Sequence, residues 1–409
     1  MSVALWAKWP VRDLSMVDIS RGSTLGGSGA SELFQLLRDG LPRTRTELAA
    51  TTGLARSTIA LRVDELMSLG LISPVGDAQS TGGRPSSQFA LNPSARFVLA
   101  ADLGATHATI AVTNLSGTIV GEMTGPINIA DGPETVLTWM VDTGRALLEQ
   151  HGLSTADVIA IGIGLPGPVE HSTGRPINPP IMPGWDQFDV PEFVRQHLEV
   201  PVLVDNDVNI MALGEQAFGW PQTDNLLFVK VATGIGAGVI SGGRLLRGAQ
   251  GIAGDIGHVR IPRGEGVACH CGNRGCLEAM ASGPAIARAL AETGLGDGTA
   301  SSVIALVKHG NIEAIQAVRQ AGRDLGEILT ACVSLMNPSV IAVGGSMAVV
   351  GDHLIAGVRE VIYARSMPLA TSRLTIAQSS AGVNAAVLGA SILAIHHALS
   401  PEGIDRMVL

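Results

Sequence analysis

The sequence predicts a mixed α/β protein in two parts, a small winged helix-turn-helix followed by a larger α/β region. Three short helical patterns and a hairpin pattern follow one another within residues 28–92. Across residues 93–409, apolar runs of strand length are separated by helical stretches, as in an α/β fold. Residues 1–27 show neither helical nor strand periodicity and end in a Gly- and Ser-rich stretch, so we expect a loose tail there.

The length and composition favour several domains. A chain of 409 residues is too long for one compact core. Hydrophobic residues make up 46% and charged residues 15%, as in a well-buried soluble protein. No run of eighteen apolar residues is unbroken, and the first 28 residues lack the apolar region of a signal peptide. We therefore expect a cytoplasmic protein with no membrane partner.

Charge is distributed unevenly along the chain. The net charge is −9, but residues 1–90 carry nine Lys or Arg and eight Asp or Glu, which gives +1 there and −10 in the remainder. Within residues 40–62, four arginines face a single acidic residue, Glu47. A basic segment on an acidic protein is typical of an attached DNA-binding module, although a solvated helix face would have the same composition.

Three helices are expected in the N-terminal part. The first has Ser31 as its N-cap and Gly40 as its stop, the second opens at Thr44 or Thr46, and the third closes on Gly70. A short Gly-containing turn joins the second and third helices, as in a helix-turn-helix. The apolar positions of the first and third helices recur at helical spacing: Leu33, Leu36 and Leu37, then Ile59, Val63, Leu66 and Leu69.

The polar face of the third helix carries residue types that contact DNA. Such side chains can donate to base edges and phosphates in a major groove. After this helix, two strand patterns flank a loop, and Arg84 in Gly82-Gly83-Arg84-Pro85 stands at the tip of this expected wing, suited to a minor groove. A protein-binding helical module and a plain turn are the alternatives. The expected DNA contacts are Arg45, Arg56, Ser57, Thr58, Arg62 and Arg84.

A cysteine cluster predicts a metal site. Cys269, Cys271 and Cys276 lie close together, and His258 stands eleven residues before the first of them. Cys₃His is the ligand set of a closed, structural zinc site, so we expect zinc to hold this loop rather than to act in catalysis. His270 is a possible competing ligand, but its position between two cysteines would point it away. Three reduced core cysteines are the alternative.

The fourth cysteine has a different setting. Cys332 lies in the apolar helical sequence EILTACVSLM, and we expect it in the core. Residues 284–335 are rich in helical patterns.

A strand that ends in Asn206-Asp207 offers acid–base chemistry. An Asp at a strand end could take a proton from a sugar hydroxyl while the Asn holds a neighbouring hydroxyl. Taken alone, such a pair is often only a turn.

Taken together, these features resemble the ROK family of repressors and sugar kinases over about residues 28–395. The resemblance rests on the GGRP wing, on GDIGHVRIPRGEGVACHCGNRGCLE and on the DN pair. It implies a two-lobed actin-like ATPase fold with a ligand cleft between the lobes, zinc beside a sugar pocket, and a homodimer or homotetramer bound to operator DNA.

The resemblance also implies sugar contacts. Asp207 matches the general base of the family's kinases, and His258 would reach the sugar while ligating zinc through its other nitrogen. Asp255 stands where the kinases carry Glu, and Ile181 where many glucokinases carry Asn, so the identity of the sugar does not carry over. The implied sugar-binding residues are Asn206, Asp207, Asp255, His258, Glu278, Gly174 and Arg175.

Three segments resemble the nucleotide loops of the fold, which would bind Mg-ATP through backbone N–H groups. The family's kinases favour DxGGTK, whereas this chain has Ala105, which adds a methyl group, and His107 in place of Lys. An inherited fold with no nucleotide bound is the alternative. The matching positions are Asp102, Gly104 and Thr106, then Thr233, Gly234, Gly236 and Gly238, then Gly344 and Gly345.

The leading hypothesis is a sugar-responsive DNA-binding regulator of carbohydrate metabolism, expected to be a repressor, that senses a sugar or sugar phosphate. The alternative is a bifunctional ATP-dependent sugar kinase with Asp207 as general base. A protein-binding N-terminal module is a third. Altered nucleotide loops and the N-terminal 90 residues favour the regulator, whereas the retained Asp207 favours the kinase.

Overall fold

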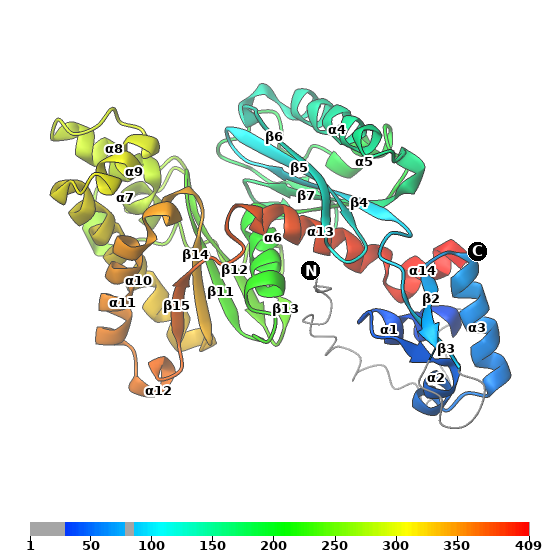
Figure 1. Cartoon of the computed structure of the whole chain (residues 1–409). Helices are drawn as coiled ribbons and strands as arrows, with labels where there is room; N and C mark the ends of the chain where they lie inside the picture. Colours follow the sequence, from blue (N-terminus) through cyan, green and yellow to red (C-terminus); the bar gives the residue numbers. More distant parts are fainter. Residues whose placement is uncertain (1–28, 78–85, 409) are drawn as a thin grey trace.

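The computed structural model describes residues 29–77 and 86–408, and it shows an N-terminal head and two lobes (Figure 1). The expected tail and the wing tip with Arg84 lie outside the described residues. Within the described ranges, no single helix is long and apolar enough to cross a membrane. One pair of helices bent by 65°, Gly382–Ala398 and Pro401–Met407, meets that test together.

The head has the predicted three helices and a small sheet of order β1-β3-β2. Thr44 caps the second helix, where its side chain and that of Glu47 form a reciprocal capping box. The prediction for Ser31 was wrong: it is buried inside the first helix, two residues after the helix begins at Gly29. The elements are α1 (Gly29–Leu37), β1 (Arg43–Thr44), α2 (Arg45–Thr52), α3 (Arg56–Ser68), β2 (Ile72–Asp77) and β3 (Ser87–Leu91).

The first lobe is built on a five-stranded sheet of order β10-β7-β4-β5-β6. Strands β4, β5 and β6 are antiparallel, whereas β7 and β10 run parallel to β4, which leaves β10 at one edge. The elements are β4 (Phe97–Leu103), β5 (His107–Asn114), β6 (Ile119–Pro126), α4 (Pro133–Gln150), β7 (Val158–Leu165), β8 (Val169–Glu170), β9 (Arg175–Pro176), α5 (Val190–Arg195) and β10 (Val202–Asn206).

The second lobe has a sheet of order β13-β12-β11-β14-β15, and the predicted helix-rich stretch packs on it. Cys332 lies half-buried against this core, close to the expectation. The elements are β11 (Leu226–Val231), β12 (Ile235–Ser241), β13 (Arg244–Leu245), α7 (Leu277–Ala281), α8 (Gly283–Glu292), α9 (Ala300–Lys308), α10 (Ile312–Met336), β14 (Val340–Gly344), α11 (Gly351–Arg365), α12 (Pro368–Thr371) and β15 (Thr375–Gln378).

Two helices lie between the lobes: α6 (Asp207–Gly214), which continues into a π-turn (Glu215–Gly219), and α13 (Ala385–Ala398). Their backbones touch, because a Cβ added to Gly389 would lie only 1.7 Å from the Ile210 carbonyl oxygen. Side chains of both helices share a core with strands of both sheets. A rotation of one lobe against the other must therefore move α6 relative to α13 or carry the two together.

The head is joined to the lobes through the C-terminal end of the chain. In Figure 1, α13 runs beneath the first lobe to α14 (Pro401–Val408), which lies beside α1. The Gln35 side chain of α1 donates to the Leu399 carbonyl, 3.0 Å away. Apolar residues of α13, its C-cap and α14 share a buried core with the head: Ala394, Ile395, Ala398, Leu399 and Ile404.

Candidate functional site

A group of charged side chains lies where α6 begins; we call it the interlobe cluster, and it consists of Asp102, Asp207, Lys230 and Glu278. Asp207 stands in the first turn of α6, with its side chain 4% exposed, and forms an ion pair with Lys230 of β11. The helix dipole favours a negative charge at this position. Asp207 directly follows β10 of the first lobe and Lys230 lies in β11 of the second, so the pair spans the junction between the lobes.

The ionisation of the interlobe cluster is coupled. Burial raises the pKa of Asp102 to about 6, although the charge of Lys230 acts in the opposite direction. Burial also disfavours the charged form of Lys230, but the carboxylates of Asp207, Asp102 and Glu278 outweigh it and raise the pKa of Lys230. Three acidic groups around one ammonium give a site with several hydrogen-bond acceptors, which suits hydroxyl groups.

Glu278 connects the interlobe cluster to one predicted phosphate loop. Its carboxylate accepts from the Ile235 N–H at 3.0 Å, and it lies against Gly234, where an added Cβ would come within 2.6 Å of it. Thr233 beside them is exposed. The backbone of this loop is therefore already engaged by an acidic side chain.

Asn206 has a structural role in this arrangement. Its side-chain oxygen accepts from the Val208 N–H at 2.9 Å and caps α6, and its amide donates to the Gly167 carbonyl at 3.0 Å. These bonds fix the start of α6 and so the direction of Asp207. A sugar could bind only to the hydrogen-bonding groups of Asn206 that these two bonds leave unused.

The predicted metal ligands come together. One ligand atom from each of His258, Cys269, Cys271 and Cys276 lies within 4.8 Å of the others. The Cys271 and Cys276 sulfurs are 3.7 Å apart, and a tetrahedron with zinc–sulfur bonds of about 2.3 Å has sulfur–sulfur edges of about 3.8 Å. The four residues therefore fit a zinc ion. His270 is exposed and is not part of this group.

The metal-ligand loop also positions Glu278. The Nδ1 of His258 faces Cys269 at 3.8 Å, which leaves Nε2 for another partner. Backbone bonds pair the two ends of the loop: Glu278 donates to the Gly257 carbonyl at 2.8 Å. A metal ion bound here would hold His258 and Glu278 in fixed relation. Asp255, on the segment before His258, is exposed.

A second charged group lies next to the first and was missed in the sequence; we call it the Asp205 cluster. Asp205 is 2% exposed, and its carboxylate accepts from Arg247 at 2.7 Å and from Asn209 at 2.7 Å, while His171 lies 3.5 Å away. Arg247 follows β13 of the second lobe, so this pair also joins the lobes. Burial, and then the charge of Arg247, lower the pKa of His171.

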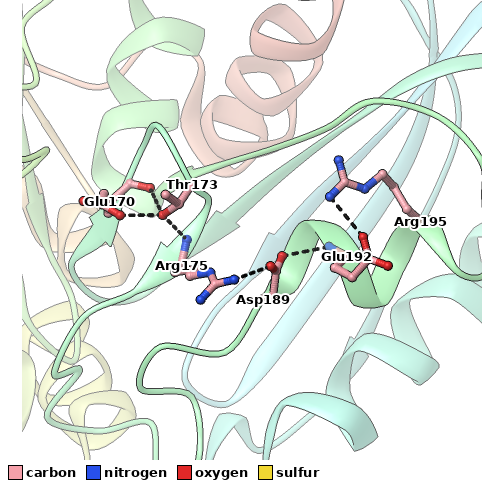
Figure 2. A network of polar contacts seen from close by, with 6 residues as sticks. All are labelled: Glu170, Thr173, Arg175, Asp189, Glu192 and Arg195. Carbon is pink, nitrogen blue, oxygen red and sulfur yellow. Dashed lines mark hydrogen bonds and ion pairs between the residues drawn. The ribbon is translucent and has the colours of Figure 1, made fainter.

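Gly174 and Arg175 do not lie in the interlobe cluster. They line a separate cavity beside the hairpin of β8 and β9, where Arg175 forms an ion pair with Asp189 at 2.5 Å (Figure 2). The sequence placed them with the other sugar contacts because the resemblance gives no distances. Figure 2 shows that the Arg175 guanidinium points toward α5.

The first predicted phosphate loop is a tight turn between β4 and β5. The Gly104 N–H donates to the His107 carbonyl at 2.8 Å, Ala105 packs on the first-lobe core, and Thr106 is exposed. Burial lowers the pKa of His107, as does the charge of Lys230, so His107 is neutral near pH 7. It does not supply the positive charge that a lysine would place there.

Close packing accounts for the other glycines of the predicted nucleotide loops. A Cβ at Gly236 would meet Val208, one at Gly238 the Val208 carbonyl, one at Gly344 the Phe228 ring, and one at Gly345 the Val231 carbonyl. Glycine at these positions lets α6 and the turn after β14 pack closely on the second-lobe sheet, whether or not a nucleotide binds.

Two of the predicted DNA contacts are exposed where α3 begins: Arg56 and Ser57, with Thr58 half-buried beside them. Arg62 instead turns back on α1, where it lies 3.8 Å from Glu32. Arg45 pairs with Asp64 at 2.6 Å and stacks over the Phe89 ring.

Residues 98–397 match the model of the ROK family. The chain belongs to the ROK family. It is 30% identical over 359 residues to the xylose repressor of Bacillus subtilis (strain 168), which covers 88% of this chain and 92% of the repressor.

Solved structures of a ROK regulator and of a ROK kinase match this chain to different extents. A ROK family transcriptional regulator, described as a homolog of the E. coli MLC protein, has a TM-score of 0.79 and 26% identity, and the match covers 93% of this chain and 98% of that one. The ROK glucokinase of Streptomyces griseus in complex with glucose and AMPPNP has a TM-score of 0.61 and 28% identity, with 73% of this chain and 99% of the kinase covered. The match to the regulator spans almost the whole chain, which confirms the predicted fold and the class of transcriptional regulator.

Proposed function

We propose that this ROK regulator is a sugar-responsive repressor that binds operator DNA and controls carbohydrate metabolism in the cytoplasm, as a homodimer or homotetramer. The main support is that the named repressors and the solved regulator align over the head as well as both lobes. The domain limits we propose are 28–92 for the winged helix-turn-helix and 93–409 for the ROK kinase-like domain.

In this proposal the sugar binds at the interlobe cluster. Asp207, Glu278 and His258 supply acceptors and a ring nitrogen, and zinc holds the loop that carries the last two. The helix whose first turn contains Asp207 packs backbone-to-backbone on α13, and α13 leads to α14 and α1. A sugar that prefers one relative position of α6 and α13 would therefore change the placement of the head; couplings of this kind are typically worth about 1–3 kcal/mol.

The DNA contact is assigned to the exposed start of α3. Recognition helices present their N-terminal residues to base edges, and Arg56 and Ser57 have that position and exposure. Arg56→Ala should weaken binding to a selected operator duplex by about tenfold or more, measured by fluorescence anisotropy. Arg319→Ala, an exposed arginine on α10, is the matched control. Equal binding by both variants would overturn the assignment.

A sugar kinase is the second candidate, because Asp207 is retained and the Streptomyces griseus glucokinase covers both lobes. Mg-ATP would lie along the loops at Gly104, Gly234 and Gly344. Neutral His107 and the engagement of the Ile235 N–H by Glu278 weigh against this candidate. ADP release with D-xylose, D-glucose or N-acetylglucosamine, abolished by Asp207→Asn, would establish the kinase activity.

A further inference from the structure

The cavity beside the β8–β9 hairpin, which we call the outer cavity, has a volume of about 460 Å³. It is lined by three segments, residues 170–175, residues within 187–195, and residues 202–204 of β10. Its volume lies within the range of about 300–1,000 Å³ found for small-molecule sites. Its described lining contains none of the four residues of the interlobe cluster, and it reaches the neighbouring Asp205 cluster only through His171, which lies 3.5 Å from Asp205.

The charged groups of the outer cavity balance one another. Two guanidinium groups, Arg175 and Arg195, and two carboxylates, Glu170 and Asp189, line the cavity, while Arg195 itself pairs at 3.3 Å with Glu192, which is not a lining residue. Arg175 donates to Asp189 at 2.5 Å, and Thr173 donates to Glu170 at 2.7 Å (Figure 2). Each guanidinium has five N–H donors and each carboxylate two acceptor oxygens, more than these contacts use. An anionic ligand would gain little from a neutral set of this kind, whereas hydroxyl groups find donors and acceptors together.

The backbone of β10 adds further polar groups. β10 is an edge strand, and among the described strands it pairs with β7 alone. The Pro201 carbonyl accepts from the Ile161 N–H of β7, so by alternation Val202 and Val204 direct their N–H and C=O groups to the free edge. The position of His171, 3.4 Å from the Val204 carbonyl, agrees with this. The free edge therefore presents backbone donors and acceptors to the outer cavity.

Apolar groups complete the lining. Pro191, Val202 and Val204 are buried residues that border the cavity next to its charged groups. Hydroxyls in several directions and apolar C–H faces between them are the features of a carbohydrate. We propose that the outer cavity binds a neutral polyhydroxylated ligand, a mono- or disaccharide, as a second site apart from the interlobe cluster.

The test uses the full-length protein and saturation-transfer NMR with D-xylose, D-glucose, N-acetylglucosamine, maltose and cellobiose as probes. Two variants address the outer cavity: Ser172→Trp, an exposed lining position where the ring would fill the space, and Arg195→Ala. Arg319→Ala is the matched arginine control, and Asp207→Asn removes the interlobe carboxylate. Thermal melting of each variant confirms folding before binding is measured.

The expected result is that at least one probe still binds Asp207→Asn, and that both outer-cavity variants weaken this binding about tenfold while Arg319→Ala leaves it unchanged. The proposal is overturned if no probe binds Asp207→Asn, or if the binding that remains is the same in Ser172→Trp and Arg195→Ala. It is equally overturned if no sugar binds the outer cavity and an extended peptide binds there instead, with changes in the NMR chemical shifts of residues 202–204.

Discussion

Two aspartates, Asp205 and Asp207, stand two residues apart and both join the lobes, yet their surroundings differ. The Asp205 carboxylate accepts from Arg247, from Asn209 and from the Asn206 N–H, so its oxygens are well satisfied. Asp207 has an ion pair with one lysine, Lys230, and has two more acidic groups near it. The difference teaches that a buried carboxylate with several hydrogen-bond partners holds a structure, whereas one with a single ion-pair partner can exchange that partner for a ligand.

This comparison gives four predictions, of which the first two have larger expected effects than the last two. Asp205→Asn should lower the free energy of unfolding by about 3 kcal/mol, because the partly buried Arg247 loses its partner charge. Urea melts of the full-length protein measure this change. If Asp205→Asn is no more destabilising than Asp207→Asn, the two aspartates do not differ as the structure indicates.

Loss of zinc should affect the site that contains Asp207 and leave the Asp205 cluster unaffected. Cys276→Ser should abolish a zinc content of about one ion per chain, and stability should fall by about 3 kcal/mol under conditions where free zinc is a hundredfold above its dissociation constant. Metal analysis and melting curves check both effects. Cys332→Ser is the matched control outside the ligand group, and it should retain the metal. A Cys276→Ser protein with full zinc content would refute the ligand set.

Asp207→Asn should cost only about 1 kcal/mol of stability, since Asp102 remains to face Lys230. The same variant should lose any rise in melting temperature caused by the sugar that stabilises the wild-type protein. Melting curves with and without that sugar separate the two effects. A large loss of stability with an intact sugar shift would reverse the roles of Asp205 and Asp207.

The last prediction concerns pH, and its effect is confined to one pH range. The folded-state pKa of Asp102, about 6, lies above the ordinary value of 3.8, so the folded state binds more protons between these values. The contribution of Asp102 to stability therefore falls as pH rises through this window. Between about pH 4.5 and pH 7, the free energy of unfolding of Asp102→Asn should rise by about 1 kcal/mol relative to that of the wild-type protein. A difference in stability between Asp102→Asn and the wild-type protein that does not change with pH would contradict the burial of Asp102 in the interlobe cluster.

Local sequence patterns predicted the fold well. Leu33 and Ile59 lie in the core of the head as their helical spacing required, and Thr44 caps α2. The grouping of His258 with three cysteines was predicted because the cysteines are close together in sequence. Ser31 was misplaced because the helix begins earlier, at Gly29, and tertiary burial overrides a capping preference.

Contacts between distant segments were not predictable. Asp205 and Arg247 are 42 residues apart and meet only when the two lobes assemble. Lys230 gave one signal, a single charge within the apolar strand LLFVKV, but that pattern does not name a partner. The separation of Arg175 from Asp207 likewise depends on the path of the β8–β9 hairpin, which no local period encodes.

We propose that a sugar bound at Asp207 releases the head from DNA. The most direct measurement is anisotropy of a selected operator duplex bound to the full-length protein, titrated with the sugar that raises its melting temperature. We expect affinity for the duplex to fall about tenfold in the wild-type protein and to stay constant in Asp207→Asn, with unchanged DNA binding without sugar. Equal sugar-dependent release by wild-type and Asp207→Asn proteins would contradict the account.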